Sequence, residues 1–240
     1  MSSILLYYAL GVLIVPGILL GIYAQAKVSR TFKTYSQVQS ENGTTASQLA
    51  RTVLDSAGLQ EIELRKEAGF LTDHYHPTKK YIALSEEVYD SSSVAALGVA
   101  MHEVGHAIQK KEHYALLGFR QVLVPITNLA SRLLWPMVII GIILGAFVTS
   151  NALIGLIFFG VGVAFYSLTL LLNLATLPVE FDASKRALKL LQDGNFLNDA
   201  ELDGARQVLK AAALTYVAAF IVAIAEMLRF ILYIFLSRDN

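Results

Sequence analysis

The sequence predicts a mainly α-helical polytopic membrane protein with about four transmembrane helices and a small α+β domain outside the lipid. Hydrophobic residues make up 55% of the 240 residues and charged residues only 16%, whereas soluble domains carry about 25% charged residues. The mean hydropathy is accordingly positive, at +0.54. The apolar residues also form long uncharged stretches, and most charged residues gather in two segments between them.

Charge and cysteine content limit the partners and the kinds of site. The formal net charge is zero and the sequence has no glycine-rich phosphate loop, so nothing in it indicates a nucleic acid as partner. The chain contains no cysteine, which excludes disulfide bonds and thiolate zinc ligands. Any metal ion would therefore be held by His, Asp or Glu side chains.

The first predicted transmembrane helix covers residues 4–24, which are 21 positions without a charge. A helix of that length crosses the roughly 30 Å hydrocarbon layer of a membrane. A cleaved signal peptide is the alternative, because residues 24–26 (Ala-Gln-Ala) resemble its cleavage site. We expect a retained helix, since no Lys or Arg precedes the apolar run and the run exceeds the usual core of about 7 to 15 residues.

Residues 25–132 form the first polar segment. Turn and capping patterns predict a helix at residues 46–57. Alternation of apolar and polar residues predicts strands at 62–65 and 80–84, with a loop or short strand at 69–77 between them. Thr44 or Thr45 would cap the helix. The edge of so small a sheet can pair with an extended peptide.

One pentapeptide in this segment, residues 102–106 (His-Glu-Val-Gly-His), has the spacing of a metal site. The preceding proline-free run of Ala, Val, Leu and Met favours a helix. Residues four apart lie on one helical face, so His102 and His106 can point at one cation. Glu103 can then reach a water molecule on that metal and act as general base. The alternative, a helix that buries two histidines without a metal, would be costly.

In the longer pattern His-Glu-x-x-His-x-x-Gly-x-x-His, the last histidine is the third metal ligand. This chain does not have that pattern. The chain has Gln109 and Glu112 where that pattern has Gly and His. Glu112 and His113 remain weak alternatives. His74 and His76 lie upstream and could be further ligands or substrate contacts, although a surface role is favoured for both.

Three further apolar stretches predict transmembrane helices. Residues 133–148 and 152–174 are uncharged and predict a hairpin. The last predicted span covers residues 211–237 and contains Glu226 and Arg229. These two residues lie three apart on one helical face, so we expect a structural ion pair rather than a proton or ion route.

Residues 178–210 form the second polar segment and supply the best candidate for a third ligand. Pro178 can start a helix, and acidic residues in a first helical turn interact favourably with the helix dipole. Glu180 would complete a His-His-Glu set and leave the fourth tetrahedral position for water. Asp182 competes for this role, and a carboxylate that simply faces solvent at a helix start is an equal alternative.

The distribution of basic residues predicts the side on which the polar segments lie. With four spans, residues 25–132 and 178–210 share one side of the membrane and hold 12 and 5 of the 19 Lys and Arg residues. The positive-inside rule places that side in the cytoplasm. The candidate ligands of both segments come out on the same side, as a shared site requires.

The two site segments and three others resemble the YugP-like family of neutral zinc metallopeptidases of bacterial membranes. The segments are residues 101–109 (Met-His-Glu-Val-Gly-His-Ala-Ile-Gln), 177–187 (Leu-Pro-Val-Glu-Phe-Asp-Ala-Ser-Lys-Arg-Ala), 71–75, 84–89 and 211–218. The resemblance implies one Zn²⁺ per chain, with His102, His106 and Glu180 as its ligands. It also implies that Glu103 is the general base.

More distantly, the arrangement is similar to HtpX-type and CAAX prenyl membrane proteases, in which a later Glu completes the zinc site. The resemblance implies a small zincin-like catalytic domain of the gluzincin type. Those proteins usually carry an Asp four residues after that Glu, in support of a ligand histidine, whereas this chain has Ser184. Ser184 or Asp182 is therefore expected to support the site here.

We therefore predict a membrane-embedded zinc endopeptidase of the cell membrane, the inner or plasma membrane of a bacterium, with its site on the cytoplasmic side. Its substrates would be peptides or membrane proteins, and the lipid bilayer would surround its helices. A zinc-bound water activated by Glu103 would attack the peptide carbonyl. Tyr216, His74 and Arg186 are the candidates for stabilising the oxyanion.

Two other functions fit parts of the pattern. A zinc-binding scaffold or chaperone-like protein would use the same ligands, but it would have no need of a base such as Glu103. A metal transporter would place the histidine pair within a span, whereas charged residues follow the motif at positions 110–112 (Lys-Lys-Glu). The scaffold is the alternative that we retain.

Overall fold

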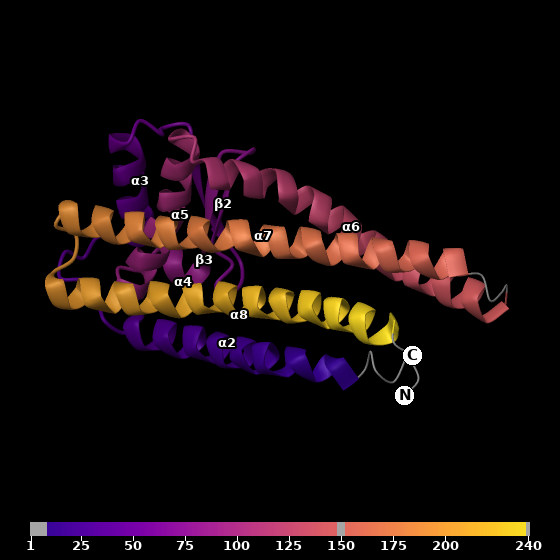
Figure 1. Ribbon diagram of the computed structural model, residues 1–240. Helices are drawn as coiled ribbons and strands as arrows, with labels where there is room; N and C mark the ends of the chain where they lie inside the picture. Colours follow the sequence, from indigo (N-terminus) through magenta and orange to yellow (C-terminus); the bar gives the residue numbers. More distant parts are fainter. Residues whose placement is uncertain (1–8, 148–151, 239–240) are drawn as a thin grey trace. The chain divides into compact units, whose positions relative to one another are not determined.

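Long helices dominate the chain, and one small sheet accompanies them (Figure 1). The computed structural model describes residues 9–147 and 152–238. In chain order the elements are η1 (Leu10–Ile14), α2 (Val15–Tyr35), α3 (Ala46–Ser56), β1 (Glu63–Glu67), β2 (His74–His76), β3 (Tyr81–Ser85), α4 (Glu86–Tyr89), α5 (Val94–Lys111), α6 (Ala115–Phe147), α7 (Ala152–Asp193) and α8 (Asp199–Arg238).

The chain divides into two compact units. The first contains the described parts of residues 1–21, 118–177 and 216–240, and the second contains residues 22–117 and 178–215. Both polar segments contribute to the second unit. The motif at residues 102–106 and the candidate ligand Glu180 are therefore parts of one compact body.

Three helices among the described residues are long and apolar enough to cross a membrane. They are Leu10–Tyr35, Gly160–Asp193 and Asp199–Leu232. Large apolar side chains such as Ile18 and Leu174 are about half exposed on them, which suits contact with lipid. The further predicted span, residues 133–148, lies on α6 and stays a prediction. Its last residue and residues 4–8 of the first predicted span lie outside the described residues.

In the first unit, α2 and α8 approach each other closely at Gly17. A Cβ atom at that position would come 2.7 Å from a Val222 methyl group, so a glycine suits this helix contact. Further along α8, Arg229 Nη2 lies 3.0 Å from Glu226 Oε2, and the two side chains are only 13% and 16% exposed. The ion pair predicted from the sequence is thus confirmed.

The sheet belongs to the second unit and has the strand order β1-β3-β2. β1 pairs parallel with β3, and β2 pairs antiparallel with β3. Ile82 and Leu84 of the central strand are fully buried in the apolar core. The strands predicted at 62–65 and 80–84 are confirmed with ends shifted by one or two residues, and a short strand forms within residues 69–77.

α3 and α5 complete the core of the second unit, and side-chain caps fix where both helices begin. The Thr45 hydroxyl accepts a hydrogen bond from the Gln48 backbone N–H, and the Gln48 side chain accepts one from the Thr45 N–H. This capping box selects Thr45 over Thr44 and confirms the predicted helix. Ser93 caps α5 by accepting a hydrogen bond from the Ala96 N–H.

One helix start predicted from the sequence is wrong. Pro178 does not begin a helix but lies inside α7, which runs unbroken for 42 residues. Proline has no N–H and so removes one helical hydrogen bond. Tertiary packing outweighs this loss, because Val179, Ala183 and Ala187 beyond the proline are all fully buried. The helix that carries Glu180 therefore begins as an apolar segment at Ala152.

Candidate metal centre

The His-Glu-x-x-His motif lies in the middle of α5, where this helix touches α7. Glycine at position 105 makes the close contact possible, because a Cβ atom there would come 2.7 Å from the Ala183 backbone oxygen. Real Cβ atoms essentially never lie that close to a backbone atom. The contact brings the turn of α7 that carries Glu180 next to the two histidines of the motif.

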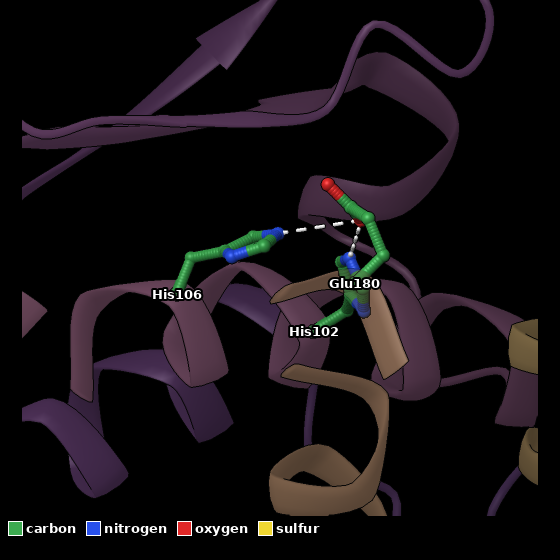
Figure 2. A group of neighbouring side chains, drawn as sticks. All are labelled: His102, His106 and Glu180. Carbon is green, nitrogen blue, oxygen red and sulfur yellow. Dashed lines mark hydrogen bonds and ion pairs between the residues drawn. The ribbon is translucent and has the colours of Figure 1, made fainter. Parts of the chain in front are cut away.

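His102 and His106 project from one face of α5 toward Glu180 (Figure 2). Glu180 Oε2 lies 3.1 Å from His102 Nε2 and 3.6 Å from His106 Nε2. The side chains of His102, His106 and Glu180 are 15%, 9% and 3% exposed. Among the described residues, these three form the group of His, Asp and Glu side chains whose ligand atoms converge, all within 4.8 Å of one another.

These separations fit a tetrahedral zinc ion. Zinc bonds to imidazole nitrogen and carboxylate oxygen are about 2.0 to 2.2 Å long, so neighbouring ligand atoms in a tetrahedral site lie roughly 3.3 Å apart. The two separations of 3.1 and 3.6 Å bracket this value. Two histidines and one glutamate are also a common ligand set of catalytic zinc sites, in which the fourth position stays open.

The second nitrogen of each imidazole also has a partner. His102 Nδ1 lies 3.2 Å from Ser184 Oγ, and His106 Nδ1 lies 2.9 Å from Gln109 Oε1. Such contacts orient the rings and leave Nε2 free for a metal. Ser184 is one of the supporting residues expected from the sequence. Gln109 was missed, although its place three residues after His106 on one helical face is an indication of the contact.

Negative charge surrounds His106. Burial disfavours a charged imidazole there, but the hydrogen bond with Glu180 and the charges of Glu103 and Glu180 outweigh burial, so the pKa of His106 lies above its ordinary value. Glu103 is itself only 8% exposed. A buried site with two carboxylates favours the binding of a cation.

A further carboxylate, that of Asp73, lies just before β2. Its Oδ1 accepts a hydrogen bond of 2.8 Å from the Ser85 N–H, and its Oδ2 accepts one of 3.0 Å from the Ser85 hydroxyl. Burial raises the pKa of Asp73, the Ser85 contacts oppose this rise, and the charge of Glu103 adds to it. No local pattern in the sequence indicates this pair, because the fold of the sheet brings the two residues together.

The other candidates from the sequence lie outside the converging group of His102, His106 and Glu180. Asp182 and Arg186 are neighbours on α7, where Arg186 Nε donates to Asp182 Oδ2 over 2.5 Å. Arg186 also donates to Glu112 over 2.6 Å, so Glu112 is part of an ion pair. His74 lies on β2, outside the converging group. Tyr216 lies on α8 in the first unit.

The family described as "Putative neutral zinc metallopeptidase" matches residues 10–235. The chain belongs to this family. Its resemblance to such metallopeptidases, inferred above from sequence motifs, is thereby confirmed. The matched residues include the three whose side chains converge, His102, His106 and Glu180.

One curated relative of the chain is "Putative membrane protease YugP" of Bacillus subtilis (strain 168). It is 41% identical over 221 residues, which cover 92% of this chain and 94% of the relative. No solved structure matches the chain. The relative is described as a membrane protease, and the described part of this chain has three helices that could span a membrane.

Proposed function

We propose that the protein is a membrane-embedded, zinc-dependent endopeptidase. One zinc ion would be held by His102 Nε2, His106 Nε2 and a carboxylate oxygen of Glu180. The observation that carries the proposal is the convergence of these three atoms at separations that suit zinc. Membership of a family described as zinc metallopeptidases supports both the metal and the class of reaction.

Bound zinc would polarise the peptide carbonyl and make a water molecule easier to deprotonate. Glu103 follows His102 directly on α5 and is nearly buried. Its carboxylate accepts a proton from the attacking water, whose hydroxyl group joins the carbonyl carbon. When the C–N bond breaks, Glu103 gives this proton to the leaving amine, so that it ends the cycle ionised as it began.

An extended peptide can reach the site along β2. This strand is the antiparallel edge of the sheet and contacts α5. An edge strand pairs with an extended segment through backbone hydrogen bonds, whatever the segment's sequence. His74 and Arg186, which belong to the same unit as the metal centre, are proposed to stabilise the oxyanion, and Ser184 and Asp182 are proposed to support the ligands.

The proposed location is the cell membrane, the inner or plasma membrane of a bacterium, with the metal site on the cytoplasmic side. The two polar segments, residues 25–132 and 178–210, hold most of the basic residues, which supports this orientation. Membrane proteins and peptides close to the membrane surface are the proposed substrates.

Zinc content and proteolysis, measured together on the full-length protein in detergent, test the proposal. Wild type and Glu103→Gln are both expected to hold about one zinc ion, because Glu103 is not a ligand. Cleavage of an unfolded reporter is expected to fall by at least about 100-fold in Glu103→Gln, since the base is lost. The control is Glu87→Gln, which alters an exposed carboxylate on α4 and should cleave like wild type.

The alternative functions give different results. If wild type holds zinc and cleaves neither soluble peptides nor membrane-protein reporters, the scaffold or chaperone-like function replaces the peptidase. Absence of zinc from the wild-type protein would refute the metal site.

A further inference from the structure

Gln109 lies one helical turn after His106 on α5 and is fully buried. Its side-chain hydrogen bonds reach the metal centre and the turn that bears Glu180. Gln109 Oε1 lies 2.9 Å from His106 Nδ1, and Nε2 lies 2.8 Å both from the Val179 carbonyl oxygen and from Asp182 Oδ2. A buried amide is stable only where each of its polar atoms meets a suitable partner.

These partners determine the orientation of the amide and the tautomer of His106. The Val179 carbonyl and the Asp182 carboxylate can only accept hydrogen bonds, so the NH₂ group of Gln109 must face them. Its oxygen then faces His106, and His106 Nδ1 must donate to it. A neutral His106 with its proton on Nδ1 has its lone pair on Nε2, which is the atom that points at Glu180.

The same amide holds α7 against α5. Val179 and Asp182 stand on either side of Glu180 in the sequence, so the two donated hydrogen bonds fix the turn that carries this ligand. Asp182 also accepts a hydrogen bond from Arg186, which in turn donates to Glu112 at the end of α5. Gln109 is thus the centre of a network that joins both helices of the site.

We propose that Gln109 is a positioning residue of the metal centre. It keeps His106 in the tautomer with Nε2 free for a metal and holds the Glu180 turn in register with α5. The proposal rests on the proposed function, because it requires that His106 and Glu180 hold zinc. Gln109 acts through these two residues and touches no substrate.

The test measures zinc affinity in addition to proteolysis. The full-length protein is purified in detergent, and the zinc Kd is obtained by competition with a chromophoric chelator. In Gln109→Met the volume is nearly kept, but the side chain can neither accept from His106 nor donate to Val179 and Asp182. Its Kd is expected to be about 10- to 100-fold higher, the usual effect of removing the partner of a ligand histidine.

Two further variants separate positioning from folding. Gln207→Met is the matched control, because Gln207 is exposed on α8 and its side chain donates a hydrogen bond to Asp203 of the same helix. The Kd of this variant should equal that of wild type. Gln109→Glu keeps an acceptor for His106 Nδ1 but, as a carboxylate, donates to neither Val179 nor Asp182, so its Kd should lie above that of wild type and below that of Gln109→Met. The visible spectrum of bound Co²⁺ should show four-coordinate metal in wild type and Gln109→Glu, and a weaker, altered spectrum in Gln109→Met.

Thermal melting of the metal-free proteins shows which variants fold. An unchanged Kd in folded Gln109→Met would overturn the proposal. If Gln109→Met does not fold, the imidazole ¹⁵N chemical shifts of His106 in the zinc-loaded wild-type protein decide: a proton on Nδ1 with zinc on Nε2 supports positioning, and zinc on Nδ1 refutes it. A wild-type protein that binds no zinc would refute the proposed function instead.

Discussion

At the scale of single residues, the two histidines of the motif differ in the support they receive. His106 donates to an amide oxygen that is itself fixed by two further contacts. His102 Nδ1 meets the hydroxyl of Ser184, at the longer distance of 3.2 Å. Many ligand histidines in zinc sites have a carboxylate as this partner, and a neutral hydroxyl raises the basicity of an imidazole less than a carboxylate does. We therefore expect His102 to be the more weakly oriented ligand.

Ser184→Ala tests this contact. The substitution removes the partner of His102 Nδ1 and leaves the ring less firmly oriented, so the zinc Kd is expected to rise about tenfold, the lower end of the usual range. Chelator competition on the purified protein measures this change. Ser56→Ala is the control, because Ser56 is an exposed residue of α3 whose hydroxyl donates to the Thr52 carbonyl of its own helix. An equal Kd in Ser184→Ala and wild type would contradict the role of Ser184.

At the scale of elements, the contact between α5 and α7 determines whether the candidate ligands can meet. Two ligands lie on α5 and one on α7, so a small separation of the helices would move Glu180 away from both imidazoles. Glycine at position 105 permits the contact, since a larger residue would meet the Ala183 backbone. Backbone cannot move aside as a flexible side chain can.

Gly105→Ala is therefore expected to impair both folding and metal binding. Overpacking of this kind costs about 1 to 3 kcal/mol, and the zinc Kd should rise as the ligands separate. Gly98→Ala in the same helix is the matched control, because its Cβ atom would lie 3.4 Å from the Ala205 Cβ. There the gain in helix propensity, up to about 1 kcal/mol, should leave stability equal or higher. Thermal melting and zinc titration of both variants measure these effects; equal behaviour would contradict the argument.

The elements also show what the sequence could and could not predict. The helix at residues 46–57, the strands and the Glu226 ion pair were predicted, because caps, alternation and helical spacing are local patterns. The histidine spacing of the motif is local in the same way, and it indicated a metal site. The unbroken helix through Pro178 was not predicted, because buried residues beyond the proline decide it. The role of Gln109 depends on partners 70 and 73 residues away along the chain.

At the scale of the whole molecule, the site requires that two segments far apart in the sequence lie on one side of the membrane. The motif belongs to residues 25–132, and Glu180 belongs to residues 178–210. Apolar helical segments run between them in α6 and α7. An even number of crossings between the segments would keep both on the same side, and the basic residues in them favour the cytoplasm.

Because the chain has no cysteine, single introduced cysteines can report this topology without background. Thr78→Cys lies in the turn after β2, and Gln192→Cys lies near the end of α7; both positions are exposed. We expect both thiols to resist a membrane-impermeant maleimide in bacterial spheroplasts and to react in inside-out vesicles, because both segments should face the cytoplasm. Labelling of both in spheroplasts would place the site outside the cell. Labelling of only one would put the motif and Glu180 on opposite sides, and a shared zinc site would then be impossible.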